Sequence, residues 1–172
     1  MSDWKTIASR TLMVGLPGPE LDHETAHRLR DLGPAGVILF GRNLDSPGQT
    51  GELLATIRGL LPHPPLLALD QEGGRVSRLE PWIGPTPSAS DLARSGEAAL
   101  TLFGEATGRG LKSLGFNLDF APVVDLCLPD ATNGIGNRSF GVDPRRTAAL
   151  AGAFLEGLQR TGVAGCLKHF PG

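Results

Sequence analysis

Ionisable side chains follow three apolar segments of the sequence, near the points where those segments end. Asp70 comes directly after one segment, and Arg78 lies just beyond it. Arg138 lies in a Gly-rich loop after a second segment, and Lys168 and His169 follow a third. Carboxylates accept hydrogen bonds from hydroxyl groups, whereas Lys and Arg donate them. This mixed set of donors and acceptors best suits a sugar as the ligand.

Each of these residues also has a plainer structural interpretation. Asp70 can cap a local turn, although a carboxylate at the end of a buried strand favours a functional role. Arg78 and Arg138 are of a type that is often solvated or ion-paired at a surface. His169 can be a core residue with satisfied hydrogen bonds, and Asp125 is either a loop cap or a site residue. Their recurrence at successive segment ends favours a shared site.

The elements that must position these residues alternate strictly between strand and helix. Such alternation implies parallel strands joined by right-handed crossovers, in a doubly wound sheet or a (β/α)8 barrel. Both architectures place their sites at the carboxyl ends of the strands. The expected strands are 11–16, 36–40, 66–69, 118–124 and 163–167, and the expected helices are 24–32, 47–61, 97–114 and 144–161, with 81–90 as a loop.

Composition and missing motifs exclude several classes of function. The net charge is −2, from 16 Lys and Arg against 18 Asp and Glu, so no basic excess favours nucleic acid. No apolar run is long enough for a membrane span, and no leader is recognisable, so we expect a cytoplasmic protein. Cys127 and Cys166 are expected to be buried thiols. No dinucleotide, P-loop, Gly-x-Ser-x-Gly or metal-binding spacing occurs, which predicts no cofactor and no metal and disfavours an unrelated doubly wound enzyme.

Several short motifs together resemble one enzyme family. They are DQEGGRV at 70–76, GNRSF at 136–140 and KHFPG at 168–172, with GVILFGRN at 36–43 and FAPVVD at 120–125. Their types and order resemble glycoside hydrolase family 3, in its bacterial β-N-acetylglucosaminidase branch. The resemblance spans nearly the whole chain. It implies an α/β fold, a (β/α)8 TIM barrel, of which residues 1–172 would supply about five of the eight units as part of a single domain.

The resemblance also implies an activity and a set of binding residues. The activity is retaining hydrolysis of terminal β-linked N-acetylglucosamine, as in cell-wall recycling, with a glycan or muropeptide as substrate. The residues that match the family's sugar-binding positions are Asp70, Arg78, Arg138, Lys168 and His169.

The family's catalytic residues have no counterpart in this sequence. In the family, a His-Asp acid/base pair and an aspartate nucleophile follow the position that matches Gly172. We therefore expect no catalytic residue in this chain, and a chain that is inactive and poorly folded alone. The alternative is a non-catalytic sugar-binding fragment, or a subunit that another chain completes.

Overall fold

The computed structural model describes residues 4–128 and 134–170, so Pro171 and Gly172 of the last motif lie outside the described residues. The chain forms two compact units. The first unit contains residues 1–69 and 114–117, and the second contains residues 70–113 and 118–172.

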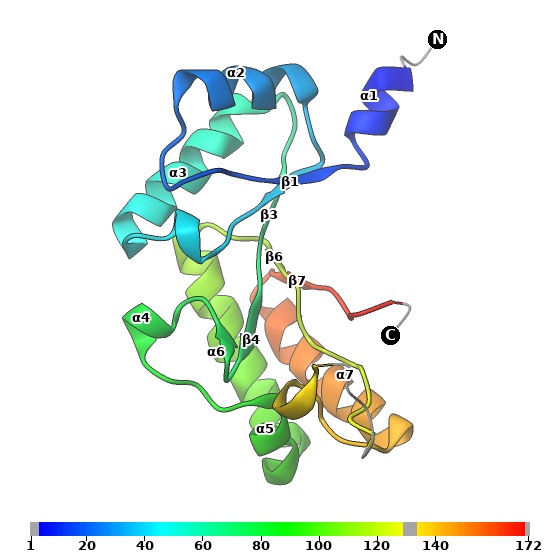
Figure 1. Cartoon of the computed structure of the whole chain (residues 1–172). Helices are drawn as coiled ribbons and strands as arrows, with labels where there is room; N and C mark the ends of the chain where they lie inside the picture. Colours follow the sequence, from blue (N-terminus) through cyan, green and yellow to red (C-terminus); the bar gives the residue numbers. More distant parts are fainter. Residues whose placement is uncertain (1–3, 129–133, 171–172) are drawn as a thin grey trace. The chain divides into compact units, whose positions relative to one another are not determined.

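The first unit consists of parallel strands and the helices that connect them (Figure 1). Strands β1, β2 and β3 pair in that order, with Val14 opposite Val37 and Val37 opposite Leu67. Val37, Leu67 and Leu69 are fully buried. The elements of this unit are α1 (Trp4–Ser9), β1 (Met13–Gly15), α2 (His23–Leu32), β2 (Gly36–Ile38), the 3-10 helix η1 (Gly41–Asn43), α3 (Pro47–Leu60) and β3 (Leu66–Leu69).

Two long helices begin where the sequence predicts them, at residues whose side chains cap the first helical turn. The Ser46 side chain accepts a hydrogen bond from the backbone N–H of Gln49, and Pro47 occupies the first position of α3. Asp143 caps α7 (Pro144–Arg160) in the same way, because its side chain accepts from the backbone N–H groups of Arg145 and Arg146.

The second unit combines a small hairpin, two long helices and a short parallel strand pair. Strands β6 and β7 pair in parallel, with Leu118 opposite Ala164. The elements of this unit are β4 (Gln71–Gly73), β5 (Val76–Ser77), α4 (Glu80–Ile83), α5 (Ala89–Ser95), α6 (Glu97–Leu114, its last residue in the first unit), β6 (Leu118–Asp119), the 3-10 helix η2 (Gly136–Arg138), α7 and β7 (Ala164–Gly165).

Helices α6 and α7 pack backbone to backbone at two glycines (Figure 1). A Cβ atom on Gly157 would collide with the carbonyl oxygen of Thr101, and one on Gly104 would collide with the carbonyl oxygen of Phe154. Only glycine permits this separation of the two helix axes.

The structure confirms the predicted alternation of strands and helices and corrects several details. Strands β6 and β7 are shorter than predicted. The segment 81–90 is not a plain loop, because α4 and α5 overlap it, and α1 was not predicted. Cys127 and Cys166 are free, as predicted, but they are half-buried rather than buried because both lie on loops or strand ends. None of the described helices is both long and apolar enough to cross a membrane.

Candidate functional site

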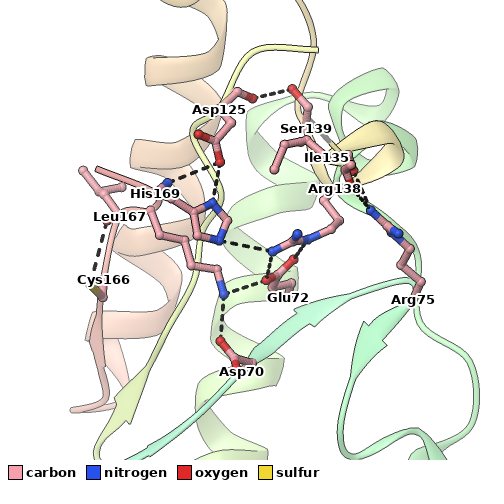
Figure 2. Close-up of polar contacts among 12 residues, drawn as sticks. Asp70, Glu72, Arg75, Asp125, Ile135, Arg138, Ser139, Cys166, Leu167 and His169 are labelled. Atoms are coloured by element: carbon pink, nitrogen blue, oxygen red, sulfur yellow. Dashed lines mark hydrogen bonds and ion pairs between the residues drawn. The ribbon is translucent and has the colours of Figure 1, made fainter. Parts of the chain in front are cut away.

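Glu72 lies at the centre of an ion network in the second unit (Figure 2). Arg138 donates to both of its carboxylate oxygens, Nε to Oε2 and Nη2 to Oε1, each at 2.7 Å. The Nζ atom of Lys168 lies 2.6 Å from Oε1 of Glu72 and 2.8 Å from Oδ1 of Asp70. The Glu72 side chain is 5% exposed, so both cations depend on a buried carboxylate.

His169 extends this network to a further carboxylate. Its Nε2 atom lies 3.4 Å from Nη2 of Arg138, and its Nδ1 atom lies 2.6 Å from Oδ2 of Asp125. Figure 2 shows the imidazole between Asp125 and Arg138, with Glu72 on the far side of the guanidinium. The cluster therefore contains both donors and acceptors, which is the composition that binding of sugar hydroxyls requires.

The hairpin β4–β5 holds Glu72 in place. The buried Gln71 side chain donates to Ser77 Oγ at 2.9 Å and accepts from the backbone N–H of Leu79 at 3.1 Å, so it ties the two strands together. Gly73 has a φ of 91°, and a Cβ atom there would lie 2.6 Å from the carbonyl oxygen of Pro87. The glycine pair of the DQEGG motif is therefore required for the turn that follows Glu72.

The other side chains come from the ends of β6 and β7 and from η2. Val123 and Lys168 form a parallel bridge, in which the backbone N–H of Val124 donates to the carbonyl of Lys168 at 2.8 Å. Arg75 donates to the backbone carbonyls of Gly134 and Ile135, which fixes the segment that precedes Arg138. Three separate segments are thus tied to each other around Glu72.

The charges of the network shift the pKa values of Glu72 and Arg138, and both shifts favour the charged forms. Burial by itself would raise the pKa of Glu72, but hydrogen bonds from Arg138 and Lys168 and their positive charges lower that pKa below its ordinary value. The hydrogen bond to Glu72 raises the pKa of Arg138 against the effect of its burial. Glu72 is therefore ionised at neutral pH and serves as an acceptor, not as a general acid.

Asp119 is a further carboxylate close to the network, and its pKa shifts in the opposite direction to that of Glu72. It is fully buried, and its Oδ1 atom accepts from the backbone N–H of Gln71 at 2.9 Å. Its Oδ2 atom has no hydrogen-bond partner among the described residues. Burial raises the pKa of Asp119 well above its ordinary value, although the Gln71 hydrogen bond and the Lys168 charge oppose the shift.

Asp119→Asn should therefore change how stability depends on pH. Because the pKa of Asp119 is raised in the folded state, its contribution to stability is complete below about pH 4, the unfolded value, and is lost as pH rises through the folded pKa. Asn carries no charge at any pH. We expect the free energy of unfolding of the variant, minus that of the wild type, to increase with pH when urea unfolding of the full gene product is followed.

Asp91→Asn is a control of opposite sign. Hydrogen bonds from the side chain and backbone of Ser88 lower the pKa of Asp91, so its contribution to stability is lost as pH falls. The difference between this variant and the wild type should decrease as pH rises. Parallel pH curves for Asp119→Asn and the wild type would contradict a buried, neutral Asp119.

The structure brings together four of the five predicted site residues, Asp70, Arg138, Lys168 and His169. Among the described residues, no hydrogen bond or ion pair joins Arg78 to these four, and its buried Nε atom has no hydrogen-bond partner. Glu72 is not among the residues predicted from the sequence, although its position two residues after Asp70 places both side chains on one face of an extended segment. The sequence allows Asp125 to be either a loop cap or a site residue, and its contact with His169 joins it to the cluster.

A cavity of about 540 Å³ adjoins the network on the side of His169. Asp125, Lys168 and His169 supply its polar wall, and apolar side chains such as Leu126 and Leu167 supply the remainder. Its volume lies within the range of about 300–1,000 Å³ for small-ligand sites. A larger cavity of about 750 Å³ in the first unit is lined mainly by apolar residues, and none of its described lining residues is a carboxylate, so it offers no comparable chemistry.

Comparisons with known proteins show which proteins this chain resembles. A 40% identical beta-hexosaminidase from Xylella fastidiosa (strain 9a5c) aligns over 94% of this chain and 50% of its own length. The structure of NagZ from Neisseria gonorrhoeae in complex with N-trifluoroacetyl-D-glucosamine matches with a TM-score of 0.89 and 34% identity, over 95% of this chain and 52% of that one. A family 3 β-N-acetylglucosaminidase from Paenibacillus sp. str. FPU-7 matches with a TM-score of 0.90 and 31% identity, over 100% and 34%.

One protein family matches almost the whole of this chain. The family described as "Glycosyl hydrolase family 3 N terminal domain" matches residues 7–172. The chain spans about half the length of the curated relatives that it matches. On this evidence the chain belongs to glycosyl hydrolase family 3, as part of the N-terminal domain.

Proposed function

We propose that this chain supplies the sugar-binding part of the active site of a retaining β-N-acetylglucosaminidase. The observation that carries the proposal is the convergence of two cations, two carboxylates and an imidazole, at Lys168, Arg138, Asp70, Glu72 and His169. Every member is oriented by a partner within the chain itself. A site ordered in advance loses little conformational entropy when a ligand binds.

The proposed roles follow from the hydrogen bonds that each side chain can still make. Asp70 has two carboxylate oxygens and one ion pair on the described residues, so it can accept from a sugar hydroxyl. Arg138 and Lys168 donate to hydroxyl oxygens, and His169, with a half-exposed side chain, borders the cavity. Arg78, whose Nε atom has no hydrogen-bond partner among the described residues, would help to place the sugar. Together these contacts hold the sugar for attack at its anomeric carbon.

N-acetylglucosamine is the proposed sugar because a 34% identical relative has been solved with N-trifluoroacetyl-D-glucosamine, a close analogue. Terminal β-linked N-acetylglucosamine in glycans or muropeptides would then be the substrate. A cytoplasmic role in peptidoglycan recycling, which the sequence predicts, stays a prediction.

Retaining hydrolysis requires a nucleophile and an acid/base group about 5–5.5 Å apart. Asp70 and Glu72 are held by Lys168 and Arg138, and the resemblance implies that the family's nucleophile and its His-Asp acid/base pair follow the position that matches Gly172. We therefore propose that both catalytic groups come from outside residues 1–172. In this proposal the chain is about five of the eight units of a single (β/α)8 barrel domain.

The direct test is an assay of the full gene product, and of residues 1–172 alone, on chromogenic glycosides. We expect the full product to hydrolyse the β-N-acetylglucosaminide faster than the β-glucoside or the α-anomer. Residues 1–172 alone should show no turnover. Binding of N-acetylglucosamine by the full product without any hydrolysis would instead support a non-catalytic sugar-binding protein. Turnover by residues 1–172 alone would contradict the proposed location of the catalytic groups.

Asp70→Ala in the full gene product should weaken the binding of N-acetylglucosamine. Loss of a charged hydrogen bond costs about 1.5–3 kcal/mol, or roughly tenfold to a hundredfold in the dissociation constant. Isothermal titration measures this constant. Asp70→Asn is the matched control, because it keeps one acceptor oxygen and should lose less affinity. Unchanged affinity in Asp70→Ala would reduce Asp70 to a partner of Lys168.

A further inference from the structure

Asp125 holds His169 at two points. Its Oδ2 atom accepts a hydrogen bond from the backbone N–H of His169 at 3.2 Å and lies 2.6 Å from Nδ1 of the ring. The Asp125 side chain is 7% exposed, whereas that of His169 is 46% exposed. A buried carboxylate therefore sets both the backbone position and the ring orientation of a residue that borders the cavity.

The two neighbours of the imidazole assign its proton independently. The Asp125 carboxylate only accepts, so Nδ1 must carry a hydrogen to bond with it. The Arg138 guanidinium only donates, so Nε2 must offer a lone pair to the Nη2 atom that lies 3.4 Å away. Both contacts select the same neutral tautomer, with the hydrogen on Nδ1.

Asp125 is also fixed from its other side. Ser139 Oγ donates to the backbone carbonyl of Asp125 at 2.7 Å, and the backbone N–H of Cys127 donates to the carbonyl of Gly141 at 3.0 Å. Ser139 directly follows Arg138 in the sequence. The loop that carries Arg138 and the loop that carries Asp125 are therefore held together, with His169 between the two side chains (Figure 2).

We infer that Asp125 is a positioning residue that locks His169 in the Nδ1–H tautomer, so that Nε2 accepts from Arg138 and holds this guanidinium at the sugar-binding site. This inference rests on the proposed function for the identity of the ligand. Arg138 is then held by Glu72 on one side and by His169 on the other, so its remaining N–H groups are oriented before they donate to a sugar hydroxyl.

The tautomer can be observed directly by nitrogen NMR of the 15N-labelled full gene product, with the His169 signals assigned by their loss in His169→Gln. We expect a hydrogen on Nδ1 and none on Nε2. In Asp125→Ala only the longer, 3.4 Å contact with Arg138 selects a tautomer, so we expect both tautomers in exchange and about tenfold weaker binding of N-acetylglucosamine. Asp125→Asn should restore the tautomer and most of the affinity, because its amide oxygen accepts both hydrogen bonds.

Asp31→Asn is the matched control. Asp31 pairs with His27 at 3.0 Å on an exposed helix face, with side chains 64% and 70% exposed, and its replacement should change neither the His169 signals nor binding. A proton on Nε2 in the wild type, or unchanged His169 signals in Asp125→Ala, would overturn the inference. The expected tautomer without any N-acetylglucosamine binding would support the lock and contradict the proposed function.

Discussion

Glu72→Ala should abolish measurable sugar binding and lower the free energy of unfolding by about 3–5 kcal/mol. Glu72 is the shared partner of Arg138 and Lys168, and its side chain is 5% exposed. Without it, two half-buried cations face each other with only Asp70 to balance Lys168. Urea unfolding and calorimetric titration with N-acetylglucosamine, both on the full gene product, measure the two effects.

Two controls separate the effect of the Glu72 charge from the effect of its side-chain volume and from the effect of losing an ordinary exposed ion pair. Glu72→Gln keeps the shape but removes the charge, so it should lose binding while it unfolds at a higher urea concentration than Glu72→Ala. Glu156→Ala removes an exposed helix pair with Arg160, whose side chains are 59% and 55% exposed, and should change stability by less than about 0.5 kcal/mol. If Glu72→Ala matched Glu156→Ala in stability and bound sugar normally, the network would have no energetic role.

Gly157→Ala should destabilise the second unit by about 1–3 kcal/mol or more, because it overpacks a rigid interface. The new Cβ atom would collide with the Thr101 carbonyl oxygen and lie 2.8 Å from the backbone nitrogen of Glu105. Both of these are backbone atoms of α6, so the helices must separate. Helix α7 precedes β7, which leads to Lys168, so we also expect weaker sugar binding.

Gly152→Ala is the matched control on the same helix. A Cβ atom there meets nothing within 4 Å, so the substitution should stabilise α7 by about 0.5–1 kcal/mol through its higher helix propensity. Thermal unfolding of both variants tests the comparison. Equal melting temperatures for Gly157→Ala and Gly152→Ala would show that the close approach of α6 and α7 is not required.

The sequence predicts the regular elements well where their signals are local. The helix from Pro47 and the helix from Pro144 begin at capping residues that act on their own backbone neighbours. The hairpin β4–β5 was missed because its strands contain only three and two residues, with glycines in place of an alternating apolar pattern.

The site was predicted less completely because its contacts are long-range. Asp70 and Lys168 are separated by 98 positions, and Glu72 and Arg138 by 66. Residue types at strand ends indicate that such groups share a site, but they do not indicate which carboxylate pairs with which cation. The central position of Glu72 and the hold of Asp125 on His169 follow only from the folded geometry.

The most direct test of the account is a crystal structure of the full gene product with N-acetylglucosamine bound. We predict sugar hydroxyls within hydrogen-bond distance of Asp70, Arg138 and Lys168, with Nε2 of His169 still against the Arg138 guanidinium. The Glu72 ion pairs should remain intact in that complex. A sugar bound elsewhere, or one held without contact to Asp70 and Lys168, would contradict the proposal that this network is the sugar-binding site.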